Sequence, residues 1–173
     1  MLNKSNENYG DDGLRKFAQR LHRNMGRDIL VQQTLDEIRL LMNVDRIVIY
    51  YFYCEWEGQV IYQSLSYEDL SLFGSKGAEN CFNEQYAAMY LAGRIRNIPD
   101  IELAGLEQCH LEFLRSINVK ANLVVPILNP FKLWGLLIAH SCQKTRNWQN
   151  YDIEIMQKAA QTLGNNPVIS QED

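Results

Sequence analysis

Two pairs of adjacent strand-like segments restrict the fold of this 173-residue sequence more than any other feature. Residues 46–54 are rich in β-branched and aromatic side chains and are apolar on both sides, which is typical of a strand covered on both faces. Residues 57–65 follow as a hairpin partner, with a turn expected at Glu57-Gly58. A second hairpin, over residues 119–128 and 133–142, is expected around Asn129-Pro130. Successive hairpins without regular β-α-β alternation predict an α+β domain with a central antiparallel sheet of about five to six strands.

Helical patterns flank these hairpins. Residues 11–27 carry an apolar stripe at helical spacing, and Gly26 is expected to break that helix before a second helix over residues 28–42 begins at the N-cap Asp28. Three further helices are predicted at residues 84–92, 103–116 and 148–163, with a short strand at 95–98. We expect the helices to pack on both faces of the sheet.

The chain is expected to form one domain, because it has no internal repeat and no linker rich in Pro, Gly or Ser. Its predicted bounds are residues 13–164, between a flexible N-terminus at 1–12 and a flexible C-terminal linker at 165–173. A formal net charge of -4 gives no electrostatic footprint for nucleic acid. No apolar stretch approaches the roughly 18 residues of a membrane span, and no signal peptide is evident, so a cytoplasmic location is expected.

The four cysteines are widely spaced, and Cys109 is the most distinctive of them. No C-x-x-C pair occurs, so the spacings of zinc and iron–sulfur sites are absent. His110 follows Cys109 inside a predicted helix, where an imidazole can make a thiol more nucleophilic. A buried structural cysteine beside a surface histidine is the ordinary alternative. No spacing of Ser and Asp completes a hydrolase triad, and we do not expect an enzyme.

A loop that follows two glycines ends in Glu79, Cys81 and Phe82. A carboxylate and a thiol two residues apart can line a cavity, although an ordinary solvated loop with one buried Phe has the same pattern.

Arg94, Arg96 and His140 are further polar candidates. The two arginines alternate on the predicted short strand and so share one face, which suits recognition of a carboxylate or phosphate. Solvent-facing charge on an edge strand is equally consistent with them. His140 lies in an apolar strand, where it is either satisfied in the core or offers a hydrogen bond into a pocket.

Three segments of the sequence resemble the bilin-binding GAF domains of cyanobacteriochromes, which are relatives of phytochromes. These segments are CFNEQYAAMYLAGRIRNIPDI, CHLEFLRSINVKANLVVPIL and LWGLLIAHSCQKTRNW. The resemblance covers roughly residues 27–163. It implies a linear tetrapyrrole cofactor, with phycocyanobilin as the first candidate and biliverdin as the alternative.

The resemblance also implies roles for individual residues. Cys109 would form a thioether to the A-ring side chain of the bilin, His110 would lie against the conjugated rings, and His140 would hydrogen-bond the terminal D-ring. Arg94 or Arg96 would pair with a propionate. The remaining chromophore-binding residues that it implies are Glu79, Cys81, Phe82, Tyr90 and Asn122.

A light-sensing domain follows from this resemblance, with reversible Z/E isomerisation at the D-ring that regulates a linked signalling output. The wavelength that the domain absorbs depends on the loop that contains Glu79 and Cys81. In the family an aspartate usually stands where this chain has Glu79, and the substitution favours a red or far-red dark state. If Cys81 instead adds to the central methine bridge, one state becomes blue or violet.

Three other functions remain as alternatives at this point. A pigment-free GAF domain would bind another small molecule such as a cyclic nucleotide, and would not need Cys109. A thiol redox protein would need the Cα atoms of Cys81 and Cys109 within about 7 Å, and a pigment cavity between the sulfurs would exclude it. A bare dimerisation module would leave the polar residues without purpose. The expected partners are neighbouring domains of a longer sensor and, through the terminal helices, a second copy of the chain.

Overall fold

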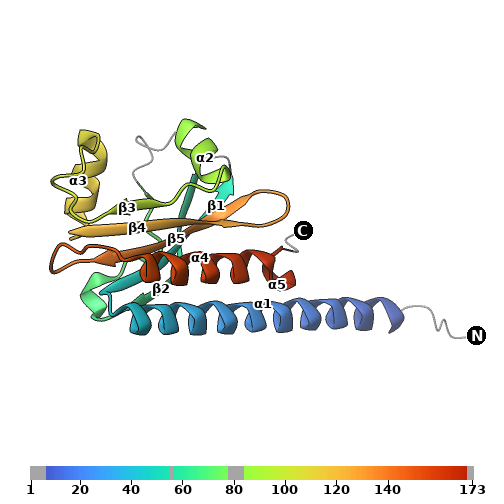
Figure 1. The fold of residues 1–173 in the computed structure, drawn as a ribbon. Helices are drawn as coiled ribbons and strands as arrows, with labels where there is room; N and C mark the ends of the chain where they lie inside the picture. Colours follow the sequence, from blue (N-terminus) through green and yellow to red (C-terminus); the bar gives the residue numbers. More distant parts are fainter. Residues whose placement is uncertain (1–6, 55–56, 78–83, 171–173) are drawn as a thin grey trace, which may run out of the picture.

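The computed structural model describes residues 7–54, 57–77 and 84–170, and its centre is a five-stranded antiparallel sheet (Figure 1). The strand order is β2-β1-β5-β4-β3. The strands are β1 (Arg46–Cys54), β2 (Glu57–Leu65), β3 (Arg96–Ile98), β4 (Ala121–Leu128) and β5 (Leu133–Ser141). Both predicted hairpins are confirmed, since β1 pairs with β2 and β4 pairs with β5. The α+β class and the antiparallel sheet are therefore as the sequence predicted.

The predicted turn at Glu57-Gly58 is wrong. Both residues belong to β2, where Glu57 pairs with Cys54 and Gly58 with Phe52. Glycine is required at position 58 because a Cβ atom there would overlap the backbone carbonyl of Tyr51 on the neighbouring strand. The glycine thus marks a close approach of two strands inside the ladder rather than a turn.

The N-terminal helix differs most from the prediction. A single helix, α1 (Glu7–Met42), replaces the two helices expected on either side of Gly26. Gly26 is exposed and has no neighbour within 4 Å of the position of a Cβ atom, so nothing forces the backbone to turn there. A lone glycine costs an exposed helix only about 1 kcal/mol relative to alanine, which good helix formers on both sides offset.

The other helices lie near their predicted positions. They are α2 (Glu84–Leu91), α3 (Gln108–Ser116), α4 (Asn150–Asn165) and α5 (Pro167–Ser170), with a 3-10 turn η1 at Glu68–Leu70. Helix α3 begins five residues later than predicted. The carboxylate of Asp100 accepts a hydrogen bond from the Glu102 backbone N–H, and Gly105 has a φ of 62°, so this stretch forms turns instead of helix.

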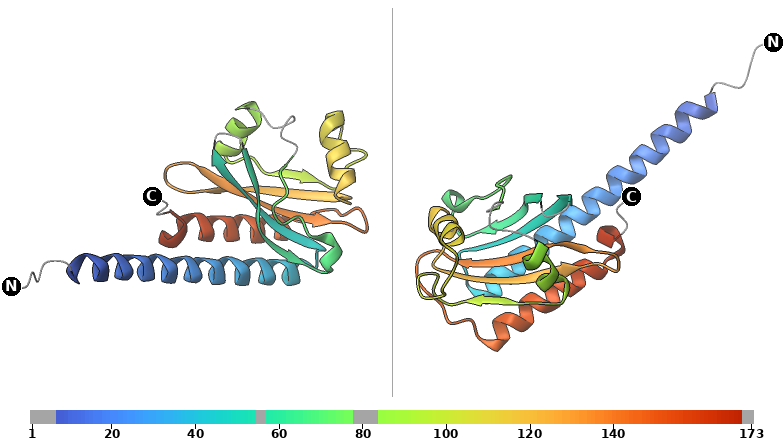
Figure 2. Two further views of the ribbon diagram at one scale, coloured as in Figure 1. Left: turned by 180° about the vertical axis from the view of Figure 1, so that it is seen from behind. Right: turned by 90° about the horizontal axis from the view of Figure 1, so that it is seen from above.

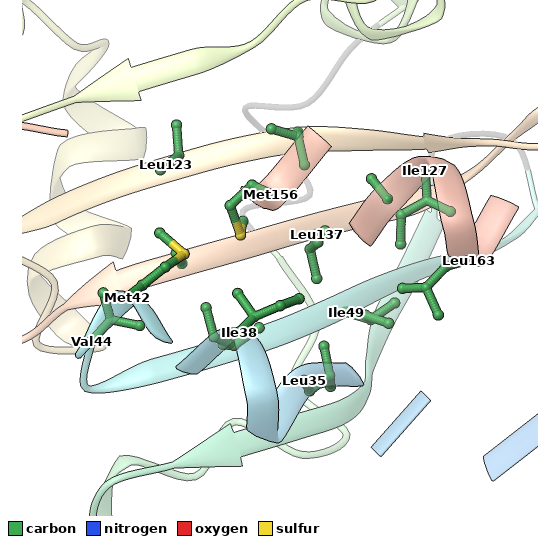
Figure 3. Packing of buried hydrophobic residues seen from close by; sticks show 14 of the residues in the cluster. Leu35, Ile38, Met42, Val44, Ile49, Leu123, Ile127, Leu137, Met156 and Leu163 are labelled. Atoms are coloured by element: carbon green, nitrogen blue, oxygen red, sulfur yellow. The ribbon is translucent and has the colours of Figure 1, made fainter. Parts of the chain in front are cut away.

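Helices cover both faces of the sheet, as predicted. Helices α1, α4 and α5 lie on one face, whereas α2 and α3 stand on the opposite face (Figures 1 and 2). The main core fills the space between the sheet and the first group (Figure 3). It includes Leu35, Ile38, Ile49, Leu123, Ile127, Leu137, Met156 and Leu163. The core thus anchors one face of the sheet and leaves the other face for a site.

Helix α1 divides into a buried and an exposed half. Val31, Leu35 and Ile38 are buried in the core, but the N-terminal half extends beyond the sheet (Figure 2). That half exposes an apolar stripe of Leu14, Phe17, Leu21, Met25 and Ile29. The stripe is suited to a contact outside this domain, and the homodimer expected through the terminal helices stays a prediction.

Both chain ends contain helix where the sequence suggested flexible segments. Helix α1 already begins at Glu7, and α5 buries Ile169 completely in the core. Within the described parts of the chain, no helix is both long enough and apolar enough to cross a membrane.

Candidate functional site

A pocket lies on the face of the sheet opposite the main core, and residues of α2 and α3 line it. Strand alternation builds it, because alternate residues of β1, β4 and β5, such as Val48, Val124 and Ile138, point to this face while their neighbours enter the main core. Its walls are mostly apolar and include Val48, Tyr50, Val124, Leu136 and Ile138. The free volume is about 1010 Å³, counting the part that opens to solvent. Such a mainly apolar pocket with a few polar groups is typical of a small-molecule site.

A row of three polar residues crosses the sheet at one end of the pocket, and two of them, His140 and Asn122, line it. Arg46 on β1 is directly opposite His140 on β5, and His140 is directly opposite Asn122 on β4. All three side chains are buried, with exposed fractions of 1%, 3% and 4% in that order. Buried polar groups require hydrogen-bond partners, so this row is a costly feature to keep without a function.

Arg46 is held by three hydrogen bonds. Its Nε donates to Nδ1 of His140 at 3.0 Å, and its two terminal nitrogens donate to the backbone carbonyls of Leu70 at 2.7 Å and Ile117 at 2.9 Å. Burial lowers the pKa of Arg46, but a guanidinium remains protonated at neutral pH. The side chain therefore ties β1 to the ends of η1 and α3 and delivers a positive charge to His140.

Two other polar atoms of the pocket lack partners. Oδ1 of Asn122 and Nε of Arg96 are buried, and neither has a hydrogen-bond partner among the described residues. An unsatisfied buried acceptor or donor costs about 1–3 kcal/mol. A ligand that offers both a donor and an acceptor would remove this cost, so these atoms support a polar ligand inside an otherwise apolar cavity.

His110 and Tyr90 line the pocket from the two helices above the sheet. Burial, with a smaller contribution from the positive charge of Arg96, lowers the pKa of the half-buried His110. Burial also raises the pKa of Tyr90, so its hydroxyl is protonated at neutral pH. His110 and Tyr90 are therefore neutral side chains, and a ligand can contact them without meeting a charge.

Burial is also the main reason that the pKa of His140 lies well below its ordinary value, and Arg46 adds to the shift. The charged side chains of the pocket wall are Lys76 and Arg96, and its other titratable side chains are His110, Tyr50, Tyr86 and Tyr90.

A pH dependence of stability follows from His140. In the folded chain His140 stays neutral, whereas in the unfolded chain it takes up a proton below pH 6.5. Stability is thus complete above this value and is lost as the pH falls. Between pH 7.5 and 5.5 we expect the free energy of unfolding to drop by about 1 kcal/mol on account of His140, with a smaller loss from His110. Urea unfolding at both pH values measures the loss. A His140→Gln variant should lose less, and an equal loss in the two proteins would contradict the assignment.

Cys109 occupies the first turn of α3, immediately before His110. Its side chain is exposed, and its sulfur is disulfide-bonded in the structure. Two other cysteines, the exposed Cys54 and the buried Cys142, are free. The first turn of a helix stabilises a thiolate, which is the nucleophilic form. A reduced Cys109 is therefore placed for covalent chemistry beside the pocket-lining His110.

The structure brings together five of the residues that the sequence singled out. Tyr90, Arg96, His110, Asn122 and His140 all line the pocket.

Arg94 does not belong to this group. The prediction that it shares a strand face with Arg96 is wrong, because β3 begins only at Arg96. The guanidinium of Arg94 instead lies 5.8 Å from the ring centroid of Tyr86.

Three predicted site residues, Glu79, Cys81 and Phe82, lie outside the described residues.

Sequence reasoning missed Arg46 and Tyr86. Arg46 precedes a run of apolar residues and reads as the polar end of a strand. The signal was available in the alternation of β1, since Arg46 shares a face with Val48 and Tyr50 and is therefore directed inward. Tyr86 precedes Tyr90 by four residues on α2, so both side chains lie on the pocket side of that helix.

Comparison with known proteins identifies the fold. The family model for the GAF domain matches residues 26–166. This chain belongs to the GAF domain family. An uncharacterised protein of Picosynechococcus sp. is 49% identical to this GAF domain over 88% of the chain and 94% of that protein. A circadian input-output histidine kinase of Synechocystis sp. is 29% identical over 68% of the chain, but the GAF domain spans only 20% of the kinase.

The structural neighbours of this GAF domain are bilin-binding GAF domains of cyanobacteriochromes and phytochromes. The blue-light-absorbing form of the Thermosynechococcus elongatus PixJ GAF domain matches with a TM-score of 0.79 and 32% identity, over 87% of this chain and 89% of that one. The phycocyanobilin-bound GAF domain of a cyanobacterial phytochrome matches with a TM-score of 0.75 and 27% identity, over 99% and 96%. A far-red-absorbing dark state with bound biliverdin matches with a TM-score of 0.70 and 25% identity, over 88% and 98%. The resemblance seen in the sequence is confirmed.

Proposed function

We propose that this GAF domain is a photoreceptor that binds a linear tetrapyrrole covalently through Cys109 and photoconverts by Z/E isomerisation at the D-ring. The observation that carries the proposal is the pocket itself. Its apolar walls suit conjugated rings, and its polar lining includes His110, His140, Asn122 and Arg96, with Cys109 beside His110. Similar GAF domains hold phycocyanobilin, phycoerythrobilin or biliverdin, and we propose phycocyanobilin as the first candidate here.

Attachment needs no oxidant. The Cys109 sulfur forms a bond to a carbon of the A-ring side chain, one carbon–carbon double bond is consumed, and the thiol proton passes to the neighbouring carbon. The sulfur that adds to the pigment is that of the reduced thiol, in its thiolate form.

The other residues of the pocket bind and orient. Light absorption and isomerisation are supplied by the bilin when it is bound. Arg96 offers its unpartnered Nε to a propionate, and His110 covers the rings as a neutral side chain. His140, held by Arg46, offers a hydrogen bond to the terminal ring in one of the photostates. Rotation of a ring of the bound pigment would exchange these contacts, and the difference in contacts would bias the sheet and terminal helices toward a signalling arrangement.

We propose a red or far-red dark state, on the basis of Glu79. A second candidate, a blue or violet state formed through Cys81, is favoured by one observation. The blue-light-absorbing PixJ domain is 32% identical to this chain, whereas the far-red-absorbing domain is 25% identical. The absorbance of the purified pigment-bearing domain distinguishes them, because addition of a second thiol divides the conjugated system and moves the maximum to shorter wavelength.

We propose that the domain has no catalytic activity of its own and regulates a neighbouring output domain. The relation to a much longer histidine kinase supports such an arrangement.

Co-expression with a bilin-producing pathway, under reducing conditions, tests the proposal. We expect a coloured protein whose pigment stays with the chain in acidic denaturant. A colourless chain would overturn the proposal. If Cys109 were then still oxidised, the result would support a thiol redox role. If Cys109 were reduced and the pocket accepted another small molecule, it would support the pigment-free alternative.

A further inference from the structure

The contact between Arg46 and His140 determines which nitrogen of the His140 imidazole carries the proton. The Nε–H group of Arg46 is a donor, and it points at Nδ1 of His140 from 3.0 Å. A nitrogen that accepts a hydrogen bond cannot carry a proton of its own. Nδ1 of His140 is therefore unprotonated, and the proton of the neutral imidazole must lie on Nε2.

The surroundings keep this arrangement in place. The guanidinium cannot swing away without leaving the carbonyls of Leu70 and Ile117, to which its terminal nitrogens donate. Arg46 itself is only 1% exposed, so water does not compete for its donors. Protonation of Nδ1 would place two donors face to face in a buried site, which is unfavourable.

We propose that Arg46 is a positioning residue that fixes the tautomer of His140, so that His140 always presents Nε2–H as a hydrogen-bond donor to the pocket. The inference rests on the proposed function only in naming the occupant. The ligand atom that meets His140 must be an acceptor, such as the carbonyl oxygen of a terminal pyrrole ring.

The neighbouring Asn122 adds to this selectivity. It is directly opposite His140 on β4, and its buried Oδ1 has no partner among the residues that the structure describes. A donor from His140 beside an acceptor from Asn122 matches a ring edge that carries a carbonyl next to an N–H group. The two strands thus present a pair of complementary groups for one lactam edge.

Nitrogen-15 NMR of the histidine-labelled chain tests the tautomer directly, first without pigment. The chain has three histidines, and His140 is assigned by the signal that a His140→Gln variant loses. Between pH 5.5 and 8 we expect the Nε2–H tautomer to exceed the Nδ1–H tautomer by at least about tenfold. A protonated Nδ1, or titration near pH 6.5, would overturn the proposal. Because no pigment is needed, such a failure is distinct from a failure to bind bilin.

The Arg46→Met variant should release the imidazole, which then occupies both tautomers and titrates nearer its ordinary pKa. The matched control is Arg146→Met, since Arg146 is also partly buried and also donates to a backbone carbonyl and to a side chain. It should leave the His140 signals unchanged. If Arg46→Met does not fold, the wild-type tautomer still decides the question.

A second readout uses the pigment-bearing domain. Arg46→Met should make the absorbance depend on pH between 5 and 8, whereas the wild-type spectrum should not change over this range. Adding His140→Gln to Arg46→Met should abolish the dependence, because glutamine does not titrate. A purely structural role of Arg46 would not predict this rescue, and persistence of the pH dependence in the double variant would contradict the proposal.

Discussion

A Cys109→Ala variant, co-expressed with a bilin-producing pathway, should lose all pigment when it is denatured in acid. The wild-type domain should keep its pigment under the same treatment. The reason is chemical, since the thioether is the only bond of the proposed site that denaturation does not break. Alanine removes the sulfur at an exposed position of α3, so the substitution opens no cavity in the core. Absorbance of the denatured protein after separation from free pigment measures the effect.

Cys54→Ala is the matched control for this experiment. Cys54 is an exposed free cysteine at the end of β1, so it tests whether any accessible thiol captures pigment. We expect Cys54→Ala to retain the full amount of pigment. Covalent pigment in Cys109→Ala together with its loss in Cys54→Ala would show that the attachment residue was wrongly assigned.

Gly164→Ala should destabilise the domain strongly. Gly164 lies near the end of α4, which packs against β4, and a Cβ atom at this position would overlap the backbone carbonyl of Leu128. A carbonyl group is not the flexible end of a side chain, so the helix and strand must move apart at the edge of the main core. We expect a loss of about 3 kcal/mol in the free energy of unfolding, measured by urea denaturation.

Gly26→Ala is the matched control, because it makes the same chemical change inside α1. No atom lies within 4 Å of the new Cβ position, and the substitution favours the helix. We expect a gain of about 0.5–1 kcal/mol. We therefore expect the free energy of unfolding to fall in Gly164→Ala and to rise in Gly26→Ala. A fall in both variants would indicate that Gly26 has a role which its open surroundings do not suggest.

The sequence predicted the sheet better than the helix ends. Strands are identified by β-branched and aromatic residues, and these gave β1 and β2 their full lengths. The predicted helix break at Gly26 was wrong because the low helix propensity of one glycine is a weak local effect, which the good helix formers on both sides outweigh. The turn at Gly58 failed because the contact that demands glycine comes from Tyr51, and only pairing of the two strands brings them together.

The sequence predicted some residues of the site and missed others. Local chemistry already singled out Arg96, His110 and His140, whereas Tyr90 and Asn122 came only from the resemblance to a family. The structure gathers all five around one pocket. Arg46 was missed because its partners are distant in sequence. Its bonds reach Leu70, Ile117 and His140, and only folding makes these residues neighbours.

Photoconversion of the pigment-bearing domain tests the central claim most directly. One sample of the purified protein is kept in the dark and another is illuminated, and both are then denatured in acid before their absorbance is measured. Denaturation removes the influence of the protein, so any remaining difference between the spectra reports the isomer of the pigment. We predict two different spectra that interconvert when the native domain is illuminated again. Identical spectra from the two samples would contradict isomerisation of a bound bilin as the function of this domain.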